Sequence, residues 1–280
     1  LYRFLLLHLN TLIYLVQSTK IMDEKSKYFN EDGIYVESNL FSNPEVSDLK
    51  KNLQQASEIE EAYFRERLPT VKRTDANMVH NTFLYSNKIL NVLEKGRIDK
   101  ILNDIFCKNS IIYAFQSSSA PPQSSNYGGR IHVDAPRFVP NYTTNVGLII
   151  ALDDFTPRNG ATQFIRGSHK MENCPTEEEF EQKKESWICK AGDALFFNAR
   201  IWHRTGMNFS NRVRDALTIN FCRPYMKTRF DFPRLIEKHK ITVDLSSQTA
   251  RYLGYWTRTP ATLEEFYVAP EERLYKSGLE

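Results

Sequence analysis

The sequence lacks a marked excess of charge of either sign. Its 280 residues contain 37 Lys and Arg against 34 Asp and Glu, which gives a formal net charge of +3 at pH 7. It also lacks runs of basic residues and any alternation of basic with aromatic residues. Binding to nucleic acid needs a concentrated basic surface, so the sequence predicts no nucleic-acid partner.

Cysteine is scarce, and closely spaced cysteine pairs are missing. The four cysteines are Cys107, Cys174, Cys189 and Cys222. Their wide separation argues against both a disulfide framework and a zinc knuckle. A reducing compartment fits this pattern best, so we predict a cytoplasmic protein. The composition leaves the oligomeric state open.

A long hydrophobic segment is also missing. The most apolar stretch, residues 4–16, is interrupted by polar residues and is shorter than the roughly 20 residues that span a bilayer. It resembles the core of a signal peptide, but no small-x-small cleavage site follows. Because an ordinary polar start begins at Met22, we interpret residues 1–21 as upstream sequence or a misassigned start rather than a targeting segment. We expect residues 22–280 to form one domain without stable membrane association.

Helical patterns dominate the first third of the chain. Asn43-Pro44-Glu45 has a capping side chain, a proline at the first helical position and an early acid, which predicts a helix that runs to about Arg67. Apolar residues then recur at helical spacing between residues 89 and 105. Gly96 is expected to divide this stretch into two short helices.

Strand patterns dominate after Asn109. The expected strands are residues 111–115, 145–152, 161–165, 187–190, 194–198 and 216–221, with an earlier short strand at 34–36. A charged helical insertion is expected at 177–185. These patterns predict a mainly β domain with flanking helices (α+β), built on a closed sheet or a two-sheet roll.

His132 and Asp134 form a His-x-Asp pair in an expected strand. Alternate side chains of a strand point to the same face, so the two residues could chelate one metal ion. His203, at the end of a later predicted strand, would complete a set of two imidazoles and one carboxylate. This is the ligand set of non-heme Fe(II) oxygenases, which leaves open positions for a cosubstrate and O₂. The pair alone is a weak signal, because a surface His beside an unrelated Asp also occurs by chance.

Arg214 adds a planar cation that could hold a carboxylate through two parallel hydrogen bonds. It shares a strand register with Ala216, Thr218 and Asn220, whereas the opposite register is apolar. A polar register that faces an interior site would explain this alternation. The alternative is a surface arginine paired with a nearby aspartate, Asp215 or Asp193.

Other His and Asp residues match the pattern of a metal site less well. His169 follows a Gly-Ser pair, and we expect its ring to hold the local turn, because the triad needs only two imidazoles. His8, His80 and His239 lack metal-like spacing and are predicted to be surface or packing residues. Asp153-Asp154 is interpreted as a solvated strand end.

Several segments together resemble the phytanoyl-CoA dioxygenase-like family. The matching segments are Asn159-Gly160, Gly167-Ser168-His169-Lys170, the Gly-Asp strand at 191–197 and the block from His203 to Arg214. The resemblance covers roughly residues 28–225 and is specific as a set rather than singly. Arg166 departs from the family pattern, which usually has proline at that position of the turn.

The resemblance implies a double-stranded β-helix (a jelly roll, cupin-like) that binds Fe(II) and uses 2-oxoglutarate and O₂. His132, Asp134 and His203 match the metal positions. Arg214 matches the residue that pairs with the distal carboxylate of 2-oxoglutarate, and Thr205 matches a hydroxyl position that binds the same carboxylate. Because related halogenases replace the carboxylate ligand with a small residue, the presence of Asp134 favours hydroxylation.

The implied activity is hydroxylation of an unactivated C–H bond of a small organic substrate, coupled to conversion of 2-oxoglutarate to succinate and CO₂. Arg130, Arg137 and Arg204 suggest an anionic substrate, although ordinary surface charge explains them equally well. One alternative is a non-catalytic jelly roll that binds a metal or small ligand. Another is a zinc hydrolase, which would have no use for Arg214.

The loop between the first core strand and the His-x-Asp pair is rich in Ser, Pro and Gly. Residues 117–130 read SSSAPPQSSNYGGR, a composition typical of a mobile segment. Because the loop leads directly to His132, we predict that it acts as a lid over the site.

Overall fold

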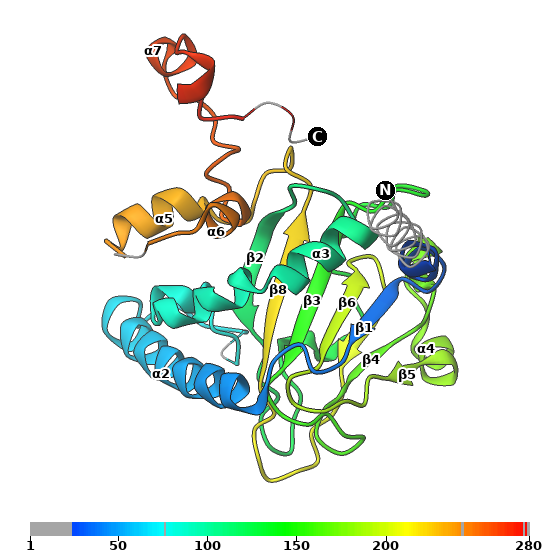
Figure 1. Ribbon diagram of the computed structural model, residues 1–280. Coiled ribbons are helices and arrows are strands. Elements are labelled where there is room, and N and C mark those ends of the chain that lie inside the picture. Colours follow the sequence, from blue (N-terminus) through cyan, green and yellow to red (C-terminus); the bar gives the residue numbers. More distant parts are fainter. Residues whose placement is uncertain (1–23, 76, 242–243, 277, 279–280) are drawn as a thin grey trace, which may run out of the picture.

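A five-stranded antiparallel sheet forms the centre of the molecule (Figure 1). In spatial order its strands are β1 (Ile34–Glu37), β6 (Ala194–Asn198), β3 (Asn145–Ala151), β8 (Ala216–Cys222) and β2 (Ile111–Ser117). This computed structural model describes residues 24–75, 77–241, 244–276 and 278. The interpretation of residues 1–21 therefore lies outside the described residues.

A second antiparallel sheet has three short strands. In spatial order they are β5 (Glu185–Ser186), β4 (Thr162–Phe164) and β7 (His203–Thr205). Isolated bridges, including His132↔His203, Phe155↔Cys189 and Asn159↔Asn208, extend the pairing around this sheet. Within the part of the chain that the structure describes, neither sheet closes on itself. The arrangement is thus mixed α and β with two antiparallel sheets, and not the closed sheet that was one of the two expectations.

Strand β3 shows why the two sheets form layers. All seven of its residues are buried. Val146, Leu148 and Ile150 belong to the large apolar core that the helices share, whereas Ile149 and Ala151 belong to a second core with residues of the small sheet. Successive side chains of the strand therefore face two different layers, as strand geometry requires.

Helices and helical turns flank the sheets (Figure 1). In the first half of the chain they are α2 (Asn43–Arg67), η1 (Thr82–Leu84), η2 (Asn87–Glu94), α3 (Gly96–Ile105) and η3 (Tyr127–Gly129). In the second half they are η4 (Ser168–Lys170), α4 (Glu177–Lys183), α5 (Phe232–Lys238), α6 (Ser247–Tyr252), α7 (Leu263–Phe266) and η5 (Pro270–Glu272). None of the helices among the described residues combines the length and apolar character needed to cross a membrane.

Most of the predicted elements are present, and several differ in detail. The N-cap of α2 is Ser42 rather than Asn43, and the Glu45 carboxylate accepts hydrogen bonds from the Ser42 N–H and hydroxyl, both at 2.8 Å. The segment before Gly96 is a 3₁₀ helix. The strand predicted at residues 187–190 lies instead at Glu185–Ser186. Within the predicted range, Cys189 forms an isolated bridge with Phe155.

Candidate metal centre

Three side chains with metal-ligating atoms meet at one point. One ligand atom from each of His132, Asp134 and His203 lies within 4.8 Å of the others. Asp134 Oδ1 is 3.5 Å from His132 Nε2 and 3.9 Å from His203 Nε2. Two imidazole nitrogens and one carboxylate oxygen can therefore converge on a single ion. This is the donor set of a facial triad, and it fits Fe(II).

Backbone carbonyls orient both histidine rings. His132 Nδ1 donates to the Arg130 carbonyl at 2.8 Å, and His203 Nδ1 donates to the Ile201 carbonyl at 2.9 Å. A carbonyl can only accept, so these bonds assign the proton to Nδ1 and leave the Nε2 lone pair directed at the metal position. Such outer hydrogen bonds typically fix the tautomer of metal-binding histidines.

The backbone around the triad differs from the regular strand that the His-x-Asp spacing predicts. His132 and His203 exchange two backbone hydrogen bonds of 3.0 Å in an isolated bridge. The next two ladder bonds do not form, because the N–H groups of Asp134 and Ala135 both donate to the carbonyl of Ala199. The segment bends at Asp134 and Ala135, and the Asp134 carboxylate lies beside the two rings.

Charge and burial act differently on the three ligands. Burial, together with the neighbouring His132, lowers the pKa of His203 to about 4. Burial also opposes the charge on His132, but the hydrogen bond and charge of Asp134 outweigh it and raise the His132 pKa. Loss of hydration likewise opposes ionisation of Asp134, yet the two histidines and Arg229 lower its pKa. The three residues can therefore offer a metal ion one carboxylate and at least one neutral imidazole.

Arg214 lies almost fully buried at the inner end of the same cavity, with 2 % of its surface exposed. Its Nη2 donates to the Gly160 carbonyl at 2.9 Å, and its guanidinium lies 4.3 Å from the centre of the Phe155 ring. Burial lowers its pKa to about 10, so it stays cationic at neutral pH. Its Nε has no partner, and it forms no ion pair within 4.0 Å among the described residues. The alternative of a surface arginine paired with Asp215 or Asp193 is therefore wrong.

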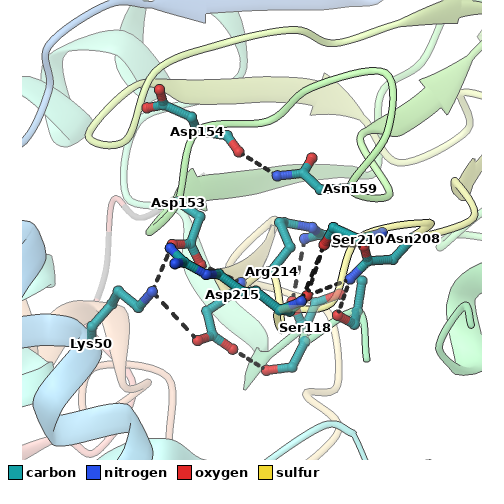
Figure 2. A network of polar contacts seen from close by, with 12 residues as sticks. Lys50, Ser118, Asp153, Asp154, Asn159, Asn208, Ser210, Arg214 and Asp215 are labelled. Atoms are coloured by element: carbon teal, nitrogen blue, oxygen red, sulfur yellow. Dashed lines mark hydrogen bonds and ion pairs between the residues drawn. The ribbon is translucent and has the colours of Figure 1, made fainter. Parts of the chain in front are cut away.

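The acids behind Arg214 are engaged elsewhere (Figure 2). Lys50 Nζ lies 2.6 Å from Asp153 Oδ1 and 3.9 Å from Asp215 Oδ2. The second oxygen of Asp153 accepts the backbone N–H of Asp215 at 2.9 Å, and the Ser119 hydroxyl donates to Asp215 at 2.6 Å. These contacts fix the backbone next to Arg214, and they do not involve its guanidinium.

The triad, Arg214 and Thr205 line one cavity of about 550 Å³. Strands β3 and β8 supply its wall, including Gly147, Ile149, Thr218 and Asn220. The polar register predicted for the strand after Arg214 therefore does reach the cavity at Thr218 and Asn220.

Close packing beside the cavity requires a glycine at position 147. A Cβ added to it would lie 2.2 Å from the Phe197 ring. That ring packs edge-on against His203, with centroids 5.1 Å apart. The missing side chain thus lets an aromatic ring support one of the triad residues.

Apart from Arg130, the polar residues around the mouth of the cavity were not predicted from the sequence. His80 pairs with Asp75 at 2.7 Å, and both line the cavity with Tyr113, Gln116 and Arg229. His80 was expected to be a surface or packing residue, but its backbone bridge to Gln116 on β2 places it at the mouth. This long-range pairing leaves no local signal in the sequence.

Other sequence candidates lie elsewhere. His169 Nε2 lies 3.2 Å from the Asn30 carbonyl and takes no part in the triad. Arg204 is neutralised by Glu177 and Glu181 of α4 and donates to Gln163. The charged helix α4 therefore supplies the two carboxylates that pair with Arg204.

The segment predicted to be a mobile lid is anchored by hydrogen bonds. Ala120 exchanges two backbone bonds with Arg214, at 2.8 and 3.0 Å, and the Ser124 carbonyl accepts from the Asn208 N–H at 2.8 Å. The Asn126 side chain donates to Ser118 and caps η3 by accepting from Gly128. These contacts favour a fixed wall of the cavity over the mobile lid.

Comparison with known proteins agrees with this geometry. A sequence model of the phytanoyl-CoA dioxygenase family matches residues 29–216. An uncharacterized protein of Mycobacterium tuberculosis is 28% identical over 199 residues, which cover 69% of this chain and 72% of that protein. The dioxygenase ALT11 of Alternaria alternata is 31% identical over 112 residues, 40% of this chain and 36% of ALT11.

Solved structures share the fold at low identity. EvdMO1 aligns with a TM-score of 0.56 and 21% identity over 72% of this chain and 50% of its own. SnoK, a non-heme alpha ketoglutarate dependent carbocyclase from nogalamycin biosynthesis, aligns with a TM-score of 0.54 and 16% identity over 71% of this chain and 83% of its own. The chain belongs to the phytanoyl-CoA dioxygenase family and is a dioxygenase-like enzyme of the kind that uses Fe(II) and 2-oxoglutarate.

Proposed function

We propose that this enzyme hydroxylates an unactivated C–H bond of a small organic substrate, with Fe(II) held by His132, Asp134 and His203. Arg214 and Thr205 would bind the distal carboxylate of 2-oxoglutarate. The observation that carries the proposal is that the triad and a buried arginine without an acidic partner line the same cavity. Iron supplies O₂ activation coupled to oxidative decarboxylation of 2-oxoglutarate.

The residues of the chain bind and orient in this reaction. The carbonyls of Arg130 and Ile201 keep the Nδ1 protons of both histidines in place, so each ring presents Nε2 to the ion. The Arg214 guanidinium already lies in a fixed position against Phe155, so it can pair with a carboxylate without reorganisation. Phe197 and Ile149 line the cavity, where their apolar side chains limit the access of water.

An anaerobic titration tests the proposal. Addition of 2-oxoglutarate to the Fe(II)-loaded protein should give a weak visible charge-transfer band, and exposure to O₂ should then yield succinate. The Zn(II)-loaded protein serves as the control and should give neither signal. Absence of both signals from the Fe(II)-loaded protein would refute the proposal.

The same titration separates the alternatives. A non-catalytic jelly roll would bind the ion and 2-oxoglutarate but form no succinate with O₂. A zinc hydrolase would be active with Zn(II) and indifferent to 2-oxoglutarate. The second alternative is disfavoured by the position of Arg214, since hydrolysis by a zinc-bound water has no need of a buried carboxylate clamp.

A further inference from the structure

Three arginines line the cavity at different depths. Arg214 is buried at the inner end, whereas Arg130 and Arg229 are exposed at the mouth. The mouth also carries His80, Gln116 and other polar groups. Two exposed cations therefore line the same cavity as the metal-binding residues.

The charges of the inner end balance when the cavity is loaded as proposed above, and the inference rests on that proposed function. Fe(II) and Arg214 together offset the Asp134 carboxylate and the two carboxylates of 2-oxoglutarate. Asp75, another acid of the lining, is paired with His80 at 2.7 Å and lies 3.7 Å from Arg73. The positive charges of Arg130 and Arg229 therefore remain without a counter-charge in the cavity.

Arg229 is held in position although its guanidinium is exposed. Its backbone N–H donates to the Tyr113 carbonyl of β2 at 3.0 Å, and Nη1 lies 3.5 Å from Gln116 Oε1. The next residue, Phe230, packs against the His80 ring with centroids 6.4 Å apart. No ion pair within 4.0 Å engages Arg229 among the residues that the structure describes. Its backbone is thus docked, while its charge is free to meet a ligand.

Arg130 is connected to the metal site through its backbone. Its carbonyl holds His132 Nδ1, and its guanidinium lies 5.8 Å from the centre of the Tyr127 ring. An anion between Arg130 and Arg229 would thus lie at the open side of the triad. A fixed contact there would decide which carbon of the substrate faces the metal.

We propose that the organic substrate carries a carboxylate or phosphate group and that Arg229, assisted by Arg130, binds this group at the mouth of the cavity. Guanidinium groups bind both oxyanions through paired hydrogen bonds. The rest of the substrate would extend inward past β8 to the metal. Arg204 and Arg137 play no part, because Arg204 is neutralised by α4 and Arg137 does not line the cavity.

The test compares charged compounds with uncharged counterparts. The Fe(II)-loaded enzyme with 2-oxoglutarate is assayed for compound-stimulated succinate formation over a panel of carboxylic acids and phosphate monoesters, each beside its methyl ester, amide or parent alcohol. The carboxylate and phosphate arms distinguish the two oxyanions. We expect the stimulating compounds to be anionic, with kcat/KM at least about tenfold higher than for the uncharged counterpart, equivalent to about 1.4 kcal/mol.

Variants locate the contact. Arg229→Gln should lower kcat/KM for the anionic compounds about tenfold or more, and Arg229→Lys should restore part of it, because an ammonium keeps the charge without the fork. The affinity for 2-oxoglutarate, measured from the charge-transfer band, should not change in either variant. Arg137→Gln removes an exposed arginine outside the cavity and serves as the matched control, with no effect on either quantity.

Three results would overturn the inference. They are stimulation by uncharged counterparts equal to that by the anions, no stimulation by any anion of the panel, and an Arg229→Gln effect no larger than that of Arg137→Gln. A wild-type enzyme that shows the charge-transfer band but prefers uncharged compounds would disprove the inference alone. Absence of both the band and succinate formation would disprove the proposed function.

Discussion

The inner end of the cavity presents one arginine and the mouth presents two, in opposite environments. Arg214 is 2 % exposed and is held by two carbonyls and an aromatic ring, whereas Arg229 is exposed and is held through its backbone and a 3.5 Å side-chain contact with Gln116. A charge pair in a dry, preorganised place is stronger than one in water. The inner end therefore suits a cosubstrate that never varies. The mouth suits weaker recognition, which can differ among enzymes of one family.

Removal of the metal ligands should have the largest effect. We expect His132→Ala, Asp134→Ala and His203→Ala each to abolish succinate formation and weaken Fe(II) binding, because each removes a ligand atom that the backbone has already positioned. Succinate assays and anaerobic Fe(II) titration check this. Wild-type succinate formation by any two of these variants would remove the triad from the reaction.

Arg214→Leu should have the next largest effect. Loss of a charge-assisted pair in a buried pocket should cost about 2–5 kcal/mol. The apparent KM for 2-oxoglutarate should thus rise by about 30-fold to several thousandfold while Fe(II) stays bound. Arg214→Lys should recover only part of this loss, since lysine lacks the planar fork. An unchanged KM in the leucine variant contradicts the role of Arg214 and the contrast between the two ends.

Gly147→Ala should disturb the inner end by overpacking. The added methyl would lie 2.2 Å from the Phe197 ring, which supports His203. Such overpacking typically costs about 1–3 kcal/mol of unfolding free energy. Thermal denaturation should show a lower Tm, and a second change, Phe197→Leu, should recover part of it. A Gly147→Ala protein as stable as the wild type would show that the ring can move away.

Glu181→Gln should have the smallest effect. Its ion pair with Arg204 lies at the surface, where such pairs contribute about 0.2–1 kcal/mol. Arg204 follows a metal ligand in sequence but does not line the main cavity, so the KM for 2-oxoglutarate should stay unchanged. A large change in this KM would mean that α4 influences cosubstrate binding. The contrast between the inner end and the mouth of the cavity would then not account for all cosubstrate binding.

The sequence predicted those parts whose determinants lie within a single segment. The strand Ala194–Asn198 has the predicted bounds, and the helix Asn43–Arg67 begins one residue before its predicted start, because capping residues and apolar patterns act locally. His132, Asp134, His203 and Arg214 were proposed from their residue types and spacing, and Thr205 from the family resemblance. The structure brings His132, Asp134 and His203 together and places Arg214 and Thr205 in the same cavity.

The parts that the sequence did not predict depend on tertiary pairing. The Asp134 segment bends because two of its N–H groups share the Ala199 carbonyl, which no local pattern encodes. His80 and Arg229 reach the mouth through backbone contacts with Gln116 and Tyr113 of β2. The composition of residues 117–130 indicated mobility, but side-chain and backbone bonds to β8 and its preceding loop hold the segment in place.

The backbone bridge between His132 and His203 bears on how a bound metal ion affects the stability of the fold. Backbone hydrogen bonds of the folded chain close the long loop between these two ligands, so the entropy of loop closure falls on folding rather than on metal binding. An ion that binds the folded chain and not the unfolded one adds about 2.7 kcal/mol of stability at one hundred times its Kd. When iron is scarce, enzyme activity should therefore fall for two reasons. The metal sites are empty, and the less stable chain is degraded faster.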